Sequence, residues 1–319
     1  MEAQTYLASL RDPAIAAALG RRIAERVASY PTTRLPITLM EVCGTHTVSI
    51  FRNGIRQILP EGIRLLSGPG CPVCVTPNAE IDRAIAMASQ QGVILATFGD
   101  MLRVPGSDAS LQEARAVGAD VRVVYSPLDA IKLAAADSTK QVVFFAVGFE
   151  TTSPAVAGAM LEARRLGLAN FTIYSAHKVI PPAMKALLES GETKIDGFIC
   201  PGHVSTIIGA RPYEFIARDH HVPCVITGFE PIDVLQGVYM LLKQLEEGRA
   251  EIEIGYRRGV LPEGNPTAQV MVERVFEPVD AEWRGIGVIP GTGLGIRDEF
   301  AAFDATRTLT VEVEKTRET

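Results

Sequence analysis

The chain has 319 residues, of which 47% are hydrophobic and 21% are charged, a balance typical of a folded globular protein. Its net charge of −6 at pH 7 and the lack of any basic cluster argue against nucleic acid or an anionic membrane as its main partner. No apolar stretch is long enough to span a membrane, and charged side chains interrupt the N-terminal residues, so neither a membrane span nor an export signal is predicted.

The cysteine content indicates a reducing compartment. The chain carries five cysteines, an odd number, and a chain of this length can bury a stable core without disulfides. Free or metal-bound thiols are therefore the simplest interpretation, and they are typical of the cytoplasm. We accordingly expect a cytoplasmic protein.

Helices and strands alternate along most of the chain. Residues 11–30 predict an amphipathic helix, because Ile15, Leu19, Ile23 and Val27 recur every four residues. Short apolar runs then predict strands at residues 37–42, 63–66, 93–97, 121–125, 142–147, 171–174, 197–200 and 222–227. Between them, segments of helical period predict helices at residues 79–90, 110–117, 154–166, 182–189 and 233–248.

This alternation predicts an α/β fold with parallel sheets flanked by helices. The strands could close into one barrel, but the hydrophilic stretch 134–141 favours a boundary between two sets of four. We therefore expect two Rossmann-like domains and an irregular C-terminal segment. The expected divisions are an N-terminal helix at 1–30, α/β domains at 31–138 and 139–259, and the C-terminal segment at 260–319.

Reactive side chains follow directly after many of the predicted strands. In parallel sheets the carboxyl ends of the strands share one edge, and binding sites are built there. The candidates at these positions are Cys43, His46, Cys71, Cys74, Asp100, Glu150, His177 and His203. Cys200 and Cys224 lie instead inside strand-like runs, which indicates core residues.

The pair Cys71 and Cys74 forms a C-x-x-C motif, whose thiols can close a disulfide or chelate a metal. The preceding residues 68–70 are Gly-Pro-Gly, which lets the backbone turn sharply toward a helix start. A helix N-terminus lowers the pKa of a thiol and increases its thiolate fraction. The alternative is that both cysteines are small buried hydrophobic residues.

Cys43 would bring the number of thiolates to three, one fewer than a closed tetrahedral zinc or cluster site. An open position suits a transient metal, a redox relay, or a site completed by another protein. Alternatively, His46 could be the fourth ligand of a structural zinc site. Asp100, Glu150 and His203 stand on glycine-flanked turns, where the carboxylates could ligate, accept protons or cap the following helices.

Several of these motifs together resemble the HypD family of hydrogenase maturation proteins. They are Glu41-Val42-Cys43-Gly44-Thr45-His46-Thr47, Gly68-Pro69-Gly70-Cys71-Pro72-Val73-Cys74, Leu95-Ala96-Thr97-Phe98-Gly99-Asp100-Met101, Tyr125-Ser126-Pro127-Leu128-Asp129, Gly148-Phe149-Glu150-Thr151-Thr152, Pro201-Gly202-His203-Val204-Ser205 and Gly228-Phe229-Glu230-Pro231. The resemblance runs in order from about residue 30 to residue 304.

The resemblance implies an assembly scaffold rather than a stand-alone enzyme. Such a scaffold holds, with a small HypC-type partner, the iron on which the Fe(CN)2CO part of the nickel–iron hydrogenase cofactor is built. HypE, fed by HypF, would supply the cyanide groups. By resemblance, Cys43 would ligate the iron together with a cysteine of the partner, and His46 would support it. Cys71 and Cys74 would form a thiol pair that handles electrons or assists ligand transfer.

The sequence departs from the family pattern near its C-terminus. Family members carry four further cysteines there, which hold a four-iron four-sulfur cluster, but this sequence has no cysteine after Cys224. Electrons for Cys71 and Cys74 would then come from another source. Two other functions remain open: a thiol-disulfide oxidoreductase acting through the C-x-x-C motif, and a structural zinc protein using Cys43, Cys71, Cys74 and His46.

Overall fold

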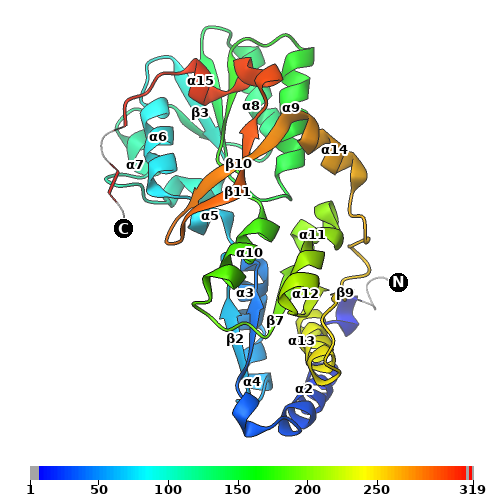
Figure 1. Cartoon of the computed structure of the whole chain (residues 1–319). Helices are drawn as coiled ribbons and strands as arrows, with labels where there is room; N and C mark the ends of the chain where they lie inside the picture. The colour runs from blue at the N-terminus through cyan, green and yellow to red at the C-terminus, as the bar shows by residue number, and fades with distance from the viewer. Residues whose placement is uncertain (1–6, 314–315, 318–319) are drawn as a thin grey trace. The chain divides into compact units, whose positions relative to one another are not determined.

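The computed structural model describes residues 7–313, 316 and 317. The chain divides into two compact units, and each is built from two separate stretches of sequence. Unit 1 comprises Met1–Cys71 and Met184–Pro266, and unit 2 comprises Pro72–Ala183 and Thr267–Thr319. Figure 1 follows the chain through both units.

Unit 1 is built on a five-stranded parallel sheet. Its strand order is β2 (Ile63–Ser67), β1 (Ile37–Glu41), β7 (Gly197–Pro201), β8 (Cys224–Thr227) and β9 (Ile252–Ile254). Strands β1, β7 and β8 are buried along their whole length. Buried central strands of this kind are hydrophobic at nearly every position, which explains why these segments read as continuous apolar runs.

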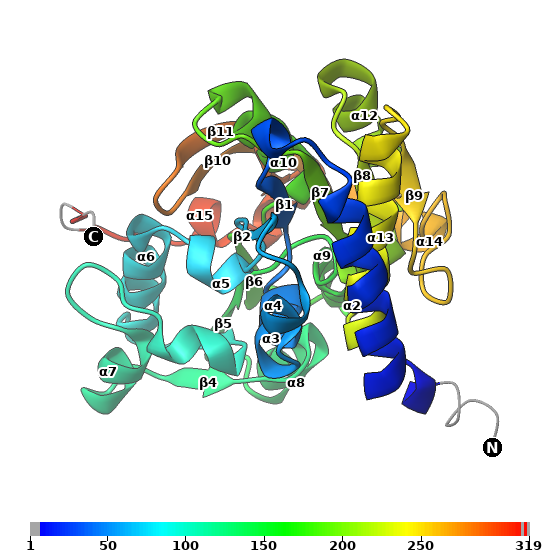
Figure 2. The ribbon, with the colours of Figure 1, turned by 90° about the horizontal axis from the view of Figure 1, so that it is seen from below.

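The helices of unit 1 cover this sheet. The N-terminal helix α2 (Pro13–Ala28) packs beside α13 (Pro231–Glu246), as both ribbon views show (Figures 1 and 2). Ile23 and Val27 of α2 share a core with Leu235 and Val238 of α13. Further helices of unit 1 are α3 (Gly44–Arg52), α4 (Ile55–Ile58), α11 (Gly202–Ile208) and α12 (Glu214–His220).

Unit 2 contains a four-stranded parallel sheet in the order β4 (Val121–Val123), β3 (Val93–Thr97), β5 (Gln141–Ala146) and β6 (Phe171–Ser175). Its helices are α5 (Pro72–Val75), α6 (Asn78–Ala88), α7 (Leu111–Ala116), α8 (Pro127–Ala136) and α9 (Ser153–Arg165). Helix α10 (Ile180–Ser190) contains the point where the chain returns to unit 1. The structure thus confirms the α/β class and all eight predicted strands. Among the described residues, no helix has the length and apolar character needed to cross a membrane.

The division into units differs from the domain boundaries expected from the sequence. The stretch 134–141 lies within unit 2, where β3 pairs with β5 directly across the expected boundary near residue 138. Strand β1 pairs instead with β7, far along the chain. Apolar runs indicate that a segment is a strand, but they do not indicate which strand it pairs with, because pairing depends on non-local packing. The sequence therefore could not predict that each unit is built from two separate stretches of the chain.

The segment from residue 260 onward is more regular than expected. It contains α14 (Pro266–Val275) and a long antiparallel hairpin of β10 (Phe276–Trp283) and β11 (Gly287–Ile296). A short 3-10 helix (Asp298–Phe303) and α15 (Ala305–Thr308) follow. Both hairpin strands contain a proline and β11 contains several glycines, residues that weaken the signal of a strand. A bulge between Val279 and Ala281 interrupts the alternation further.

Candidate functional site

Cys43 lies at the carboxyl edge of the unit 1 sheet. Strand β1 ends at Glu41, and Cys43 is the N-cap residue of α3 with an extended backbone. Its side chain is 8% exposed. The thiol is thus held where a strand gives way to a helix N-terminus, a position that favours a negative charge.

The glycine loop before Cys71 packs directly against Cys43. The N–H of Gly44 donates to the carbonyl of Gly70 at 2.9 Å, and the N–H of Gly68 donates to the carbonyl of Glu41 at 2.7 Å. A Cβ atom on Gly70 would stand 2.1 Å from the nitrogen of Cys43, so no other residue fits there. A Cβ atom on Gly44 would lie 3.5 Å from that of Cys71. The glycines therefore allow Cys71 to approach the Cys43 loop.

A buried carboxylate organises the backbone around Cys43. Glu41 is 1% exposed, and its carboxylate accepts the N–H of Cys43 at 3.0 Å and the hydroxyl of Thr47 at 2.5 Å. Burial raises the pKa of the Cys43 thiol, and the charge of Glu41 acts in the same direction. The N–H groups of Thr45 and His46 oppose this shift. Cys43 is therefore a protonated thiol until a cation replaces its proton.

His46 is a neutral imidazole with one unused nitrogen. Its ring is fully buried, and Nε2 lies 2.9 Å from the carbonyl of Gly228 and 2.8 Å from the hydroxyl of Thr227. Because a carbonyl only accepts, we assign the proton to Nε2, which leaves a lone pair on Nδ1. Nδ1 is buried without a hydrogen-bond partner. Burial lowers the pKa of His46 to about 4, so the ring can accept a hydrogen bond or a cation at Nδ1.

An aromatic stack connects His46 to His203. The ring of Phe229 lies 4.7 Å from that of His46 and 3.9 Å from that of His203, in stacked geometry with both. His203 is the second residue of α11, which directly follows β7, and it is exposed. The structure therefore brings His203 to the same edge as Cys43 and His46, as the strand-end pattern predicts.

Cys71 and Cys74 differ in their surroundings. Cys71 is half-buried and ends the first stretch of unit 1, whereas Cys74 is exposed in α5, the first helix of unit 2. None of the five cysteines, all of which lie in the described part of the chain, is in a disulfide. Within residues 7–313, 316 and 317, no group of three or more His, Cys, Asp or Glu side chains is arranged to hold a metal.

Glu150 is a buried titratable group at the sheet edge of unit 2. It follows β5, and its carboxylate accepts the N–H of Ile180 at 2.8 Å. It caps the start of α10 rather than the helix that follows it directly. The second oxygen, Oε2, is buried without a partner. Burial raises the pKa of Glu150 to about 7, so this carboxyl can exchange a proton near neutral pH.

Comparison with known proteins settles the family. The HypD model, described as the hydrogenase formation hypA family, matches residues 16–319. The hydrogenase maturation factor HypD of Rhodobacter capsulatus is 48% identical over 303 residues, covering 94% of this chain and 80% of that protein. HypD of Escherichia coli K12 is 48% identical over 278 residues, covering 87% and 74%. A putative hydrogenase expression/formation protein of Methanocaldococcus jannaschii is 46% identical over 268 residues, covering 84% and 74%.

The chain belongs to the HypD family. The eight candidate residues are divided between the units of this HypD chain. Cys43, His46, Cys71 and His203 belong to unit 1, and Cys74, Asp100, Glu150 and the buried His177 belong to unit 2. Asp100 lies in the short 3-10 helix Gly99–Arg103 and is exposed.

The sequence interpretation of this HypD chain missed three contributors. Glu41 and Phe229 lie beside predicted site residues within the motifs, and a charged residue closing the apolar run 37–42 was a usable signal for Glu41. The third is the ion pair of Lys178 with Glu80, whose closest oxygen lies 3.1 Å from Nζ. Lys178 is 1% exposed. Only the partner carboxylate explains such burial of an ammonium group, and sequence alone does not identify that partner.

Proposed function

We propose that this chain is the scaffold on which the Fe(CN)2CO part of the nickel–iron hydrogenase cofactor is assembled in the cytoplasm. Iron is the cargo of this reaction, and Cys43 supplies a thiolate ligand to it. A small HypC-type partner completes the coordination with a cysteine of its own. HypE, charged by HypF, donates the cyanide groups. Membership of the HypD family supports the role in hydrogenase maturation.

The observation that carries the proposal is the packing of the glycine loop against Cys43. The loops that carry Cys43 and Cys71 contact each other at one sheet edge through Gly70 and Gly44. The described residues do not complete a metal centre from three of their own side chains. Soft thiolate ligands suit iron, and a site short of ligands requires a partner to complete it.

The residues around Cys43 control when its thiolate forms. Burial keeps the thiol protonated in the free chain, so iron binding must release a proton and its affinity must rise with pH. The start of α3 then faces the thiolate with N–H groups. His46 offers the unpartnered Nδ1 as a hydrogen-bond acceptor or proton acceptor beside this site. We propose that His203, Asp100 and Glu150 assist ligand transfer as proton carriers.

Cys71 and Cys74 serve in this proposal as the redox pair or as further ligands. Formation of their disulfide would release two electrons and two protons, which the assembly reaction can use. In relatives with a four-iron four-sulfur cluster, the cluster would exchange electrons with this pair.

The decisive experiment is anaerobic co-expression with a HypC-type protein and HypE, followed by metal analysis and infrared spectroscopy of the purified complex. Iron with stretching bands of both CO and CN is the expected result. Stoichiometric zinc without those bands would contradict the proposal and favour a structural zinc protein. Cys200→Ala is the matched control, because Cys200 is fully buried inside β7 and should retain the iron.

The exposure of Cys74 supports a second candidate, a thiol-disulfide oxidoreductase. An exposed thiol within a C-x-x-C motif can attack a substrate disulfide. This function requires only Cys71 and Cys74, whereas the scaffold also requires Cys43. Reduction of a disulfide-bonded test protein by a Cys43→Ala variant at the wild-type rate, with no iron bound by the wild type, would favour the oxidoreductase.

A further inference from the structure

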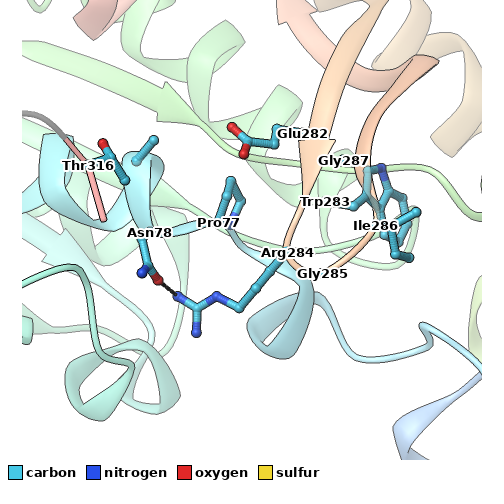
Figure 3. Close-up of a pocket in the computed structure, with 10 residues that line it drawn as sticks. Pro77, Asn78, Glu282, Trp283, Arg284, Gly285, Ile286, Gly287 and Thr316 are labelled. Carbon is cyan, nitrogen blue, oxygen red and sulfur yellow. Dashed lines mark hydrogen bonds between the residues drawn. The ribbon is translucent and has the colours of Figure 1, made fainter. Parts of the chain in front are cut away.

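The tip of the β10–β11 hairpin contacts the helix that carries Cys74. The backbone N–H of Arg284 donates to the carbonyl of Val75, the last residue of α5, at 2.9 Å. Its guanidinium donates to Oδ1 of Asn78 at 2.5 Å and to the carbonyl of Pro105 at 2.9 Å. Figure 3 shows this guanidinium reaching the Asn78 amide. One residue therefore holds both the end of α5 and the first residue of α6.

Helix α5 needs such support because it has only four residues. A single turn is far too short to be stable by itself in water, and the carbonyls at its end require external donors. The residues just after Cys74 are fixed: Val75, Thr76 and Asn78 are at most 6% exposed. Cys74 itself is exposed. The residues that follow the motif are therefore held in the core, while the thiol of Cys74 is accessible to reagents.

The hairpin that carries Arg284 packs into the core of unit 2 through the preceding residue. Trp283, the preceding residue, is fully buried. Its indole N–H donates to the hydroxyl of Thr292 at 2.8 Å, and its ring stacks on Phe149 at 5.9 Å. Phe149 directly precedes Glu150. The turn beyond Arg284 depends on Gly285 and Gly287, with φ of 76° and 98°, a region that disfavours other residues.

The Arg284 side chain lies beside a hollow, and its Nε is buried without a hydrogen-bond partner. The hollow, of about 310 Å³, is lined by residues of the hairpin tip and of the start of α6, among them Pro77, Asn78, Glu282 and Ile286 (Figure 3). Removal of the guanidinium would therefore release α5 and α6 from the hairpin without creating a cavity in a tight core. Its effect should be local to the C-x-x-C segment.

We infer that the β10–β11 hairpin is a positioning element for the C-x-x-C motif, with Arg284 as its positioning residue. The inference rests on the proposed role of Cys71 and Cys74 as a working thiol pair. Cys71 directly precedes α5 and Cys74 lies within it, so holding the turn in α5 fixes the position from which Cys74 can reach Cys71. When the turn loosens, the effective concentration of one thiol at the other falls.

The test measures the equilibrium between this thiol pair and glutathione on the metal-free chain without partners. Each turnover converts two thiols and one glutathione disulfide into the Cys71–Cys74 disulfide and two glutathione thiols, so electrons and protons balance. Arg284→Ala should lower the equilibrium constant roughly three- to tenfold, the effect of losing about one hydrogen bond. Asn78→Ala removes the acceptor and should lower it similarly. The double variant should show less than the product of the two effects.

Arg122→Ala is the matched control, because it removes the same charge and side chain from an exposed ion pair with Asp120 in unit 2. It should leave the constant unchanged. An unchanged constant in folded Arg284→Ala, or an equal fall in Arg122→Ala, would overturn the inference. If Arg284→Ala does not fold, Asn78→Ala provides the test instead, because it removes the acceptor of the same hydrogen bond. Because no iron is used, failure of this test is distinguishable from failure of iron assembly.

Discussion

The strand ends of unit 1 and of unit 2 carry different kinds of chemistry. In unit 1 the edge presents a thiol at a helix N-terminus and a neutral histidine with an unused nitrogen. In unit 2 the edge buries a carboxyl that titrates near neutral pH and an ammonium–carboxylate pair. A thiol that becomes a ligand by losing its proton, beside a neutral imidazole with an unused lone pair, suits a transient cation. Buried titratable groups suit proton exchange and fixed positioning.

The strongest test of this difference is Cys43→Ala. We expect iron retention to fall below detection, because the variant lacks the thiolate that the site is built around. The free energy of unfolding should change by only about 1 kcal/mol, since a small side chain at a strand end is lost. Metal analysis and urea denaturation measure the two effects. Unfolding in Cys43→Ala, combined with iron loss in Cys200→Ala, would place the site elsewhere.

Glu150→Gln tests the buried carboxyl of unit 2. Because the folded pKa is raised from 4.5 to about 7, the stability that Glu150 contributes is fully present below pH 4.5 and is lost as pH rises toward 7. The shift corresponds to about 3 kcal/mol at most. The variant should therefore lose less stability than the wild type between pH 4.5 and 7. If the free energies of unfolding of the two proteins fall equally between pH 4.5 and 7, Glu150 is not a buried carboxyl that titrates in this range.

His46→Gln tests the unused nitrogen in unit 1. Glutamine can keep a donor toward the carbonyl of Gly228 but lacks the Nδ1 lone pair. Groups that support metal ligands are commonly worth 10–100-fold in affinity, and we expect a loss in that range for iron. Anaerobic titration with Fe²⁺ measures it, with His221→Asn as a control at an exposed histidine. Unaltered affinity would make His46 a purely structural residue.

Asp100→Asn should give the smallest effect. The residue is exposed on a short 3-10 helix, so the free energy of unfolding should change by no more than about 0.5 kcal/mol. A role in ligand transfer predicts a slower assembly of the iron group, by less than about tenfold. The rate at which the infrared bands appear is the measurement. A rate identical to wild type would remove Asp100 from the site.

The sequence by itself determined the local features of this protein. Period and composition located every strand of the two parallel sheets except β9, and glycine and proline spacing placed Cys43 and Cys71 beyond strand ends. These predictions succeeded because side-chain periodicity and turn chemistry act over a few residues. The position of Cys43 just after a strand needed no knowledge of the rest of the chain, whereas helix α3, which Cys43 caps, was not predicted.

The tertiary structure alone decided which segments lie together. It paired β1 with β7 and β3 with β5, and so interleaved two units that the sequence suggested were consecutive. It also folded residues 276–296 into a hairpin whose Arg284 contacts α5. It buried Glu150 and Lys178, which moved the pKa of Glu150 and required Glu80 as a partner for Lys178. Strand partners, burial and buried charge pairs all depend on residues far apart in the chain, and no local pattern encodes them.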